Sequence, residues 1–219
     1  PLLEIAKTFQ LKVIEDAAEV IGQTYKGKPC GSFGDISTLS FYPNKHITTG
    51  EGGMVLVNDD ELGEKCKSLR NLCFGKTDRF VHEERGWNFR MSNLQAAVGV
   101  AQLERLSETI EKKLFIGRLY LDFLAGHDDF LLPPLKNDFC RNIFWIFGLV
   151  SQKHKKNARW WMNELFKKGI GTRPFFHPLD NQPALQSKKI QEKLPNAKML
   201  STFGFYLPSG ITLKENQIK

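Results

Sequence analysis

Residues 40–53 read Ser-Phe-Tyr-Pro-Asn-Lys-His-Ile-Thr-Thr-Gly-Glu-Gly-Gly, and this stretch decides both the fold and the candidate site. A strand-like segment, residues 36–42, leads into it, and an apolar run, residues 54–57, follows it. These flanks predict strands, and the polar, glycine-rich part between them predicts a turn at the edge of a sheet. Lys45 would stand on that turn, where glycines allow another group to come close.

Another strand is predicted before this stretch. Residues 2–9 have apolar side chains at helical spacing, and residues 12–15 read as a short buried strand. Helix followed by strand is typical of an α/β fold with parallel strands. Asp16 closes the strand at the carboxyl edge of the sheet, where α/β proteins place their ligands.

Helix signals follow the second apolar run. Asp59 begins a predicted helix that turns Leu62, Cys66 and Leu69 to one side. Ser92 and Gln95 form a capping-box pattern, which opens a longer helix that continues to about residue 124. The apolar residues of that helix that we expect to face inward are Leu94, Ala97, Val98 and Ala101.

The dipeptide Pro133-Pro134 is the predicted domain boundary, because the order of elements changes after it. We expect residues 1–132 to form part of a large domain and a connecting helix. Residues 133–219 would form a small α+β domain with a strand over 142–150 and a helix over 155–168.

Composition limits the possible functions. The 219 residues carry 31 Lys+Arg and 24 Asp+Glu, a net charge of +7, but the lysines are scattered, so an enzyme with anionic ligands is favoured over a nucleic-acid binder. No stretch approaches the roughly 20 apolar residues of a membrane helix. Four cysteines without C-x-x-C spacing fit a reduced, cytoplasmic protein, and the histidines show no metal-ligand spacing.

Asp16 and Lys45 are the pair of groups that a pyridoxal-phosphate enzyme needs. A lysine amine reacts with the cofactor carbonyl, and a carboxylate pairs with the protonated pyridine nitrogen, which keeps the ring an electron sink. Spacing alone leaves a second interpretation open, in which Lys45 is a surface lysine and Asp16 a capping residue.

Several motifs resemble the DegT/DnrJ/EryC1/StrS family of sugar aminotransferases, over nearly the whole chain. They are residues 15–19 (EDAAE), 34–35 (GD), 40–53, 86–91 (GWNFRM) and 93–97 (NLQAA). Two C-terminal motifs, residues 171–176 (GTRPFF) and 204–210 (GFYLPSG), look like the perosamine synthase branch of the family.

The resemblance implies a type I PLP-transferase fold, the aspartate aminotransferase fold. It also implies a PLP-dependent aminotransferase that moves an amino group, with glutamate as donor, to a nucleotide-linked 4-keto-6-deoxy sugar used for surface polysaccharides or glycans. A GDP-linked sugar is favoured. Alternatives are a PLP-dependent sugar dehydratase of the same family, disfavoured because such enzymes carry His where Lys45 stands, and a non-catalytic fragment with a binding or regulatory role.

The resemblance also assigns residues. Lys45 matches the lysine that binds the cofactor covalently and moves the proton, and Asp16 matches the partner of the pyridine nitrogen. Ser40 matches the hydroxyl that binds the cofactor phosphate. Glu19 falls beside the phenolic oxygen, where the wider family has Gln or His. Asn88 matches a residue that serves the phosphate of the neighbouring subunit, which implies a homodimer with shared active sites.

Two arginines are weaker candidates for substrate binding. Arg90 lies on the same motif as Asn88 and would contact an anion, or brace the interface. Arg173 would hold the donor carboxylate with its two parallel N–H groups, or belong to packing around residues 174–176. Family members are longer than this chain, so we expect the part before Pro1 to complete the cofactor pocket, and this fragment alone to be inactive.

Overall fold

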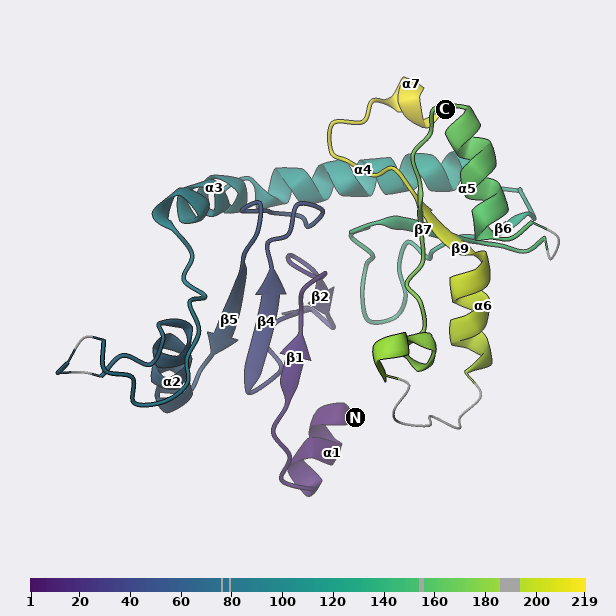
Figure 1. Ribbon diagram of the computed structural model, residues 1–219. Coiled ribbons are helices and arrows are strands. Elements are labelled where there is room, and N and C mark those ends of the chain that lie inside the picture. The colour runs from purple at the N-terminus through teal and green to yellow at the C-terminus, as the bar shows by residue number, and fades with distance from the viewer. Residues whose placement is uncertain (76, 79, 154–155, 186–193) are drawn as a thin grey trace. The chain divides into compact units, whose positions relative to one another are not determined.

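The computed structural model describes residues 1–75, 77–78, 80–153, 156–185 and 194–219 (Figure 1). The chain divides into two compact units. Unit 1 contains Pro1–Ile110 and Asp138–Arg141, and unit 2 contains Glu111–Asn137 and Asn142–Lys219.

Unit 1 is built on a three-stranded sheet in the order β1-β4-β5. The strands are β1 (Ile14–Asp16), β4 (Ile36–Ser40) and β5 (Gly53–Val57). β1 is parallel to β4, as the sequence predicts, but β5 runs antiparallel to β4. The sheet is therefore mixed, because residues 41–52 return the chain directly as a hairpin loop, whereas parallel neighbours are joined by a crossover that usually contains a helix.

The predicted helices of unit 1 are confirmed. They are α1 (Leu2–Thr8), α2 (Asp60–Arg70), α3 (Asn93–Leu103) and the first turns of α4 (Leu106–Leu124). The helix predicted from Ser92 to about residue 124 is thus divided into α3 and α4. Asp59 caps α2 by accepting a hydrogen bond of 2.8 Å from the Leu62 amide. The capping box of Ser92 and Gln95 opens α3. A small antiparallel hairpin, β2 (Thr24–Tyr25) with β3 (Lys28–Pro29), lies between β1 and β4 in the chain.

The orientation of α3 corrects a prediction. Leu94 is 84% exposed and Val98 47% exposed, and Ala97 and Ala101 are exposed as well. The side turned toward the hairpin loop carries Gln95, Gly99 and Gln102 instead. This follows because α3 packs against main-chain atoms of that loop, which amide side chains can satisfy and aliphatic side chains cannot.

The sheet of unit 1 is also less buried than its sequence suggests. Residues 12–15 were expected to form a buried strand, but Ile14 is 71% exposed, and on β5 Val55 is 50% exposed. The buried cluster of unit 1 lies at the other end of the sheet, around Phe41 and Ile47 of the loop and Ile21. Apolar residues in the sequence therefore predict where the strands lie, but they do not predict which parts of the sheet other elements cover.

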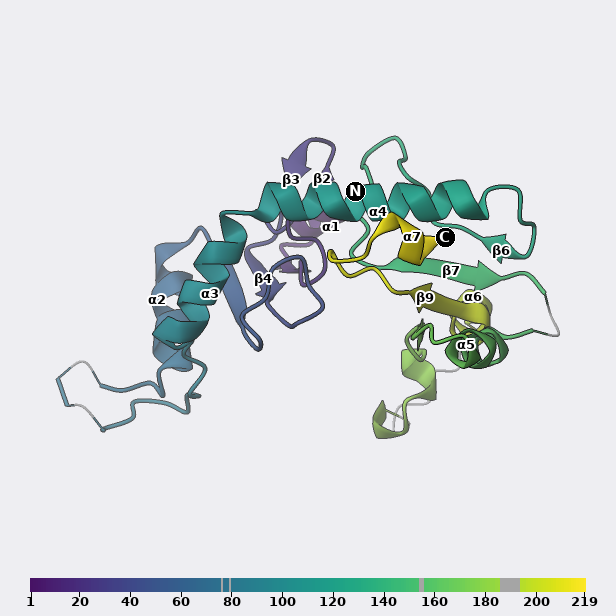
Figure 2. The same cartoon turned by 90° about the horizontal axis from the view of Figure 1, so that it is seen from above.

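Unit 2 is a four-stranded antiparallel sheet in the order β6-β7-β9-β8. Figure 2 shows the second half of α4 along one face of this sheet and α5 and α6 on the other. The elements are β6 (Phe130–Leu131), β7 (Phe147–Ser151), α5 (Ala158–Lys167), β8 (Arg173–Pro174), α6 (Pro195–Phe203) and β9 (Gly204–Leu207), with the short helices η1 (Leu179–Asn181), η2 (Pro183–Leu185) and α7 (Glu215–Ile218).

The two units adjoin in sequence within α4, between Ile110 and Glu111, whereas the dipeptide Pro133-Pro134 predicts a boundary after residue 132. The reason is that the second half of α4 builds the core of unit 2. The centroids of the Tyr120 and Phe147 rings lie 4.8 Å apart. The Phe144 ring packs so closely against Gly117 that a Cβ at position 117 would collide with it. None of the helices in the described part of the chain has the length and hydrophobicity that a bilayer crossing requires.

Candidate active site

Lys45 lies on the hairpin loop between β4 and β5. Its amide donates a hydrogen bond of 3.0 Å to the Tyr42 carbonyl, which folds the start of the loop into a turn. The side chain is only 10% exposed, and Nζ lies 3.1 Å from Oε1 of Glu19, whose side chain is 44% exposed. An amine that is mostly shielded from water and held by a carboxylate has a fixed position, as a reacting group requires.

The loop is ordered first by its own backbone. The Phe41 amide donates to the Gly52 carbonyl over 2.9 Å, and the Thr49 amide donates to the Phe41 carbonyl over 3.0 Å. Gly52 has a φ of 154°, and a Cβ there would collide with Oγ1 of Thr49, so glycine is required at this position. These bonds continue the β4–β5 ladder into the loop that carries Lys45.

Helix α3 holds the same loop from outside. Oε1 of Gln102 accepts a hydrogen bond of 2.9 Å from the Thr48 amide, and Nε2 of Gln95 donates one of 3.0 Å to the Glu51 carbonyl. Oε1 of Gln95 also accepts a hydrogen bond of 3.0 Å from the Ser92 amide. We call this pair, Gln95 and Gln102, the glutamine clamp.

The sequence predicted the capping box but not the glutamine clamp. A signal was present, because Glu and Gln both complete a capping box and only Gln adds an N–H donor. The choice of Gln at position 95 thus indicated an acceptor nearby, which the structure identifies as the Glu51 carbonyl.

Asp16 and Ser40 end two neighbouring parallel strands. Asp16 pairs in register with Thr38, so Ser40 lies two residues farther along β4 at the same carboxyl edge of the sheet. Oδ1 of Asp16 accepts a hydrogen bond of 3.0 Å from the Ala18 amide, and Oγ of Ser40 accepts one of 3.3 Å from the Tyr42 amide. Each side chain keeps further hydrogen-bonding capacity for a ligand.

Glu15, next to Asp16, has a different task. Its carboxylate accepts hydrogen bonds from the amides of Gly31 (2.6 Å), Phe33 (2.8 Å) and Gly34 (3.2 Å), and from Oγ of Ser37 (3.1 Å). Burial alone would raise the pKa of Glu15, but these hydrogen bonds outweigh it and the pKa is lowered. Glu15 therefore ties the glycine-rich loop to the strand that presents Asp16.

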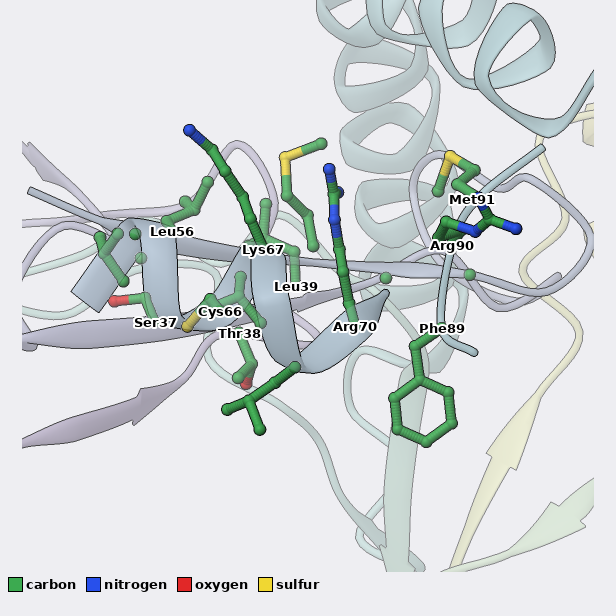
Figure 3. A pocket seen from close by; sticks show the side chains of 18 of the residues that line it. Ser37, Thr38, Leu39, Leu56, Cys66, Lys67, Arg70, Phe89, Arg90 and Met91 are labelled. Carbon is green, nitrogen blue, oxygen red and sulfur yellow. The ribbon is translucent and has the colours of Figure 1, made fainter. Parts of the chain in front are cut away.

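Asn88 and Arg90 lie on a separate cavity of unit 1, of about 1340 Å³, which residues of β4, β5, α2 and segment 87–91 line. Lys45 and Asp16 are not among its described lining residues. Both Asn88 and Arg90 are exposed. Figure 3 shows Lys67 and Arg70 extending from α2 in one direction, with the Phe89 ring pointing the opposite way.

Arg173 belongs to unit 2, on β8, where it pairs in register with Tyr206 of β9. Its side chain is exposed and lines a cavity of about 360 Å³ within that unit. The predicted site residues are thus placed in three groups. Lys45, Glu19, Asp16 and Ser40 lie at the sheet edge, Asn88 and Arg90 on the large cavity, and Arg173 in unit 2.

The group at the sheet edge suits pyridoxal phosphate by its donor set. It offers a shielded amine for the carbonyl carbon, a carboxylate for the pyridine nitrogen and a serine hydroxyl for the phosphate, all on the loop and strand ends of unit 1. The described residues contain no cluster of three or more His, Cys, Asp or Glu side chains placed to hold a metal ion.

The sequence signature of the DegT/DnrJ/EryC1/StrS aminotransferase family matches residues 1–219. The chain belongs to this family. Aminotransferases of the DegT/DnrJ/EryC1/StrS family depend on pyridoxal phosphate, the cofactor that the residues at the sheet edge fit.

Individual relatives agree with this assignment. GDP-perosamine synthase of Caulobacter vibrioides is 37% identical over 219 residues, which cover 100% of this chain and 59% of that protein. GDP-perosamine synthase of Escherichia coli O157:H7 is 37% identical over 217 residues, covering 99% and 58%. Among solved structures, Helicobacter pylori PseC, an aminotransferase involved in the biosynthesis of pseudoaminic acid, has a TM-score of 0.90 at 26% identity, covering 98% of this chain and 58% of PseC. The chain therefore spans less than two thirds of the relatives it matches.

Proposed function

We propose that the protein containing this chain is a pyridoxal-phosphate-dependent sugar aminotransferase of the perosamine synthase type. It would take an amino group from glutamate and transfer it to the 4-keto carbon of a nucleotide-linked 6-deoxyhexose, with GDP as the nucleotide, for surface polysaccharide or glycan synthesis in the cytoplasm. The observation that carries this proposal is the shielded Lys45 amine, held 3.1 Å from Glu19 on a loop at the carboxyl edge of the sheet.

Pyridoxal phosphate, when bound, supplies a carbonyl carbon for the amino group and a conjugated ring that accepts an electron pair. Asp16 would hold the proton on the pyridine nitrogen, since an ionised carboxylate favours the charged ring. The Ser40 hydroxyl would bind the phosphate. Lys45 Nζ would take the α-proton of glutamate and later deliver a proton to the sugar carbon, acting first as base and then as acid. Glu19 would hold the lysine amine in place between these transfers.

The arginines would orient the substrates. We assign Arg173 to the carboxylate of the amino donor, because a guanidinium matches a carboxylate with two parallel N–H groups. Arg90 would contact an anionic group of the nucleotide sugar. The positive charge and the exposure of both side chains support these roles.

Covalent trapping tests the role of Lys45. The complete gene product is incubated with pyridoxal phosphate, reduced with borohydride and digested, and the modified lysine is identified by mass spectrometry. We expect the label on Lys45, and Lys45→Ala should slow the half-reaction with glutamate by at least about 100-fold. Lys7→Ala, on the exposed surface of α1, is the matched control. Label on another lysine, or unchanged turnover in Lys45→Ala, contradicts the proposal.

We also propose a homodimer with shared active sites, in which Asn88 serves the cofactor phosphate of a partner subunit. Exposed apolar side chains support an interface here, since Leu94 and Val98 are solvent-exposed on α3 and the Trp87 and Phe89 rings stack with centroids 6.1 Å apart. In a two-fold dimer both contacts occur twice, which gives two equal sites.

Complementation tests the shared site. An Asn88→Ala variant that also carries Arg90→Ala is mixed with Lys45→Ala, unfolded and reassembled. Shared sites predict that heterodimers regain activity although both parents are inactive, because one of their two sites is then fully wild type. Verified heterodimers without activity would place all three residues in one subunit's site.

A further inference from the structure

A second set of polar groups surrounds Arg173 in unit 2. Residues 171–173 and 206–209 line a cavity of about 360 Å³. Arg173 and Tyr206 are directly paired across the β8–β9 ladder, so their side chains lie on the same face of the sheet. Ser209, which carries a hydroxyl, lines the same cavity. One guanidinium with neighbouring hydroxyl groups suits a carboxylate ligand.

The wall formed by Pro208 and Ser209 is held by two side chains of α4. Lys113 Nζ donates hydrogen bonds to the Ser209 carbonyl (2.7 Å) and to Oγ of Ser209 (3.1 Å). The Tyr120 hydroxyl donates one of 2.8 Å to the Pro208 carbonyl. Lys113 and Tyr120 are two helical turns apart and therefore lie on the same face of α4. Two consecutive carbonyls after β9 are thus fixed to one helix.

Stability alone does not account for Lys113. The residue is only 7% exposed, and burial lowers its pKa to about 8. A buried cation carries a desolvation cost, which an apolar side chain of similar length would avoid. The hydrogen bonds of Lys113 go entirely to Ser209 in the described residues, so what the cation provides is the position of that residue.

We propose that Lys113 is a positioning residue that fixes the Pro208–Ser209 wall of the Arg173 cavity and thereby sets the affinity of this cavity for a carboxylate. The identification of this carboxylate as that of the amino donor rests on the proposed function. Without Lys113, Ser209 would lose two hydrogen bonds, and its hydroxyl would no longer be held in one orientation at the cavity that Arg173 lines.

Direct binding tests this inference without turnover. Calorimetry on the complete gene product measures the dissociation constant of glutarate, with inorganic phosphate as a second probe. We expect glutarate to bind and Arg173→Met to abolish its binding. Lys113→Met should weaken glutarate binding by about tenfold, because the released Ser209 hydroxyl would no longer be held for a hydrogen bond to the carboxylate, and this is about the loss expected for one such bond. Lys113→Arg should restore part of the affinity, and Arg118→Met, on the exposed side of α4, should change nothing.

Steady-state kinetics separate positioning from a merely structural role. Lys113→Met should raise the KM for glutamate and leave the KM for the nucleotide sugar unchanged, while thermal melting shows the fold intact. Glutarate affinity within twofold of wild type in Lys113→Met overturns the proposal, as does phosphate binding as tightly as glutarate. If Lys113→Met does not fold, Ser209→Ala, which removes only the hydroxyl contact, must show the weaker binding instead.

The two proposals fail in different ways. Should trapping place no cofactor on Lys45 while glutarate binding still depends on Arg173 and Lys113, the aminotransferase proposal falls and the carboxylate cavity stands. If Lys45 is labelled but Lys113→Met leaves glutarate binding unchanged, the aminotransferase proposal stands and the role of Lys113 is refuted.

Discussion

Replacing Gln95 with glutamate keeps the capping box of α3 but removes one bond of the glutamine clamp. That bond reaches the hairpin loop between β4 and β5 that carries Lys45, which we call the lysine loop. In Gln95→Glu a carboxylate oxygen still accepts from the Ser92 amide, so the cap survives. The Nε2 donor to the Glu51 carbonyl is lost, and an oxygen takes its place. The Glu51 carbonyl keeps the 2.8 Å hydrogen bond from Oγ1 of Thr49. A lost hydrogen bond costs about 1 kcal/mol, and the two oxygen acceptors that then face each other add to this cost, so we expect the loop to lose about 1.4 kcal/mol of local stability.

Chemical labelling of the cofactor-free complete gene product measures this loss. Lys45 is 10% exposed in the closed loop, so its acetylation requires the loop to open. A local loss of about 1.4 kcal/mol makes Lys45 acetylation about tenfold faster in Gln95→Glu. Hydrogen exchange of the Thr49 amide, which donates to the Phe41 carbonyl, should accelerate in parallel.

Ser92→Ala is the matched control, because it removes the cap hydroxyl and leaves the Gln95–Glu51 bond in place. It should lower the free energy of unfolding by about 1 kcal/mol and leave Lys45 acetylation close to the wild-type rate. Equal acetylation rates in the two variants would refute the reasoning, since the loop would then depend on the helix and not on the clamp.

Other predictions concern stability in urea. Burial lowers the pKa of Lys113 from 10.5 to about 8, so the unfolded chain binds more protons than the folded chain between these pH values. From pH 7 to pH 10 the free energy of unfolding of the wild type should therefore rise by about 2.5 kcal/mol relative to that of Lys113→Met. Curves of unfolding free energy against pH that run parallel for the two proteins would contradict this. Glu15→Gln should cost about 2 kcal/mol at neutral pH, and because hydrogen bonding lowers the pKa of Glu15, the wild-type advantage should disappear as the pH falls below its ordinary 4.5. Gly117→Ala places a Cβ against Phe144 and should cost about 1–3 kcal/mol, whereas Gly210→Ala, with open space around it, should stay within about 0.5 kcal/mol.

Local signals predicted the elements of this chain well. Asp59 and Ser92 begin helices as expected, because a cap depends on residues only three positions away. The inward side of α3 could not be read in the same way. Leu94 and Val98 look like core residues, but the partner of the helix is the backbone of a loop, and a hydrophobic pattern does not report where main-chain acceptors lie.

In the candidate site, too, contacts within one motif could be predicted from the sequence, whereas contacts between distant residues could not. The residues of one motif, such as Ser40 and Lys45, stay together because the hairpin keeps them near one strand end. The Lys45–Glu19 contact joins residues 26 positions apart, and the Gln102–Thr48 contact joins residues 54 positions apart. Such pairs depend on how strands and helices pack, so spacing could nominate Lys45 but could not identify Gln102.

The lysine loop is anchored almost entirely through main-chain atoms, and this bears on how the protein could diversify. The bonds reach the Phe41 and Glu51 carbonyls and the Thr48 amide, while the exposed Tyr42 and Glu51 side chains take no part in these bonds. Mutational drift at such side chains would alter what an incoming molecule meets without moving the lysine. Libraries meant to change the surface of the loop without displacing Lys45 should therefore begin with saturation at positions 42 and 51 and leave helix α3 unchanged.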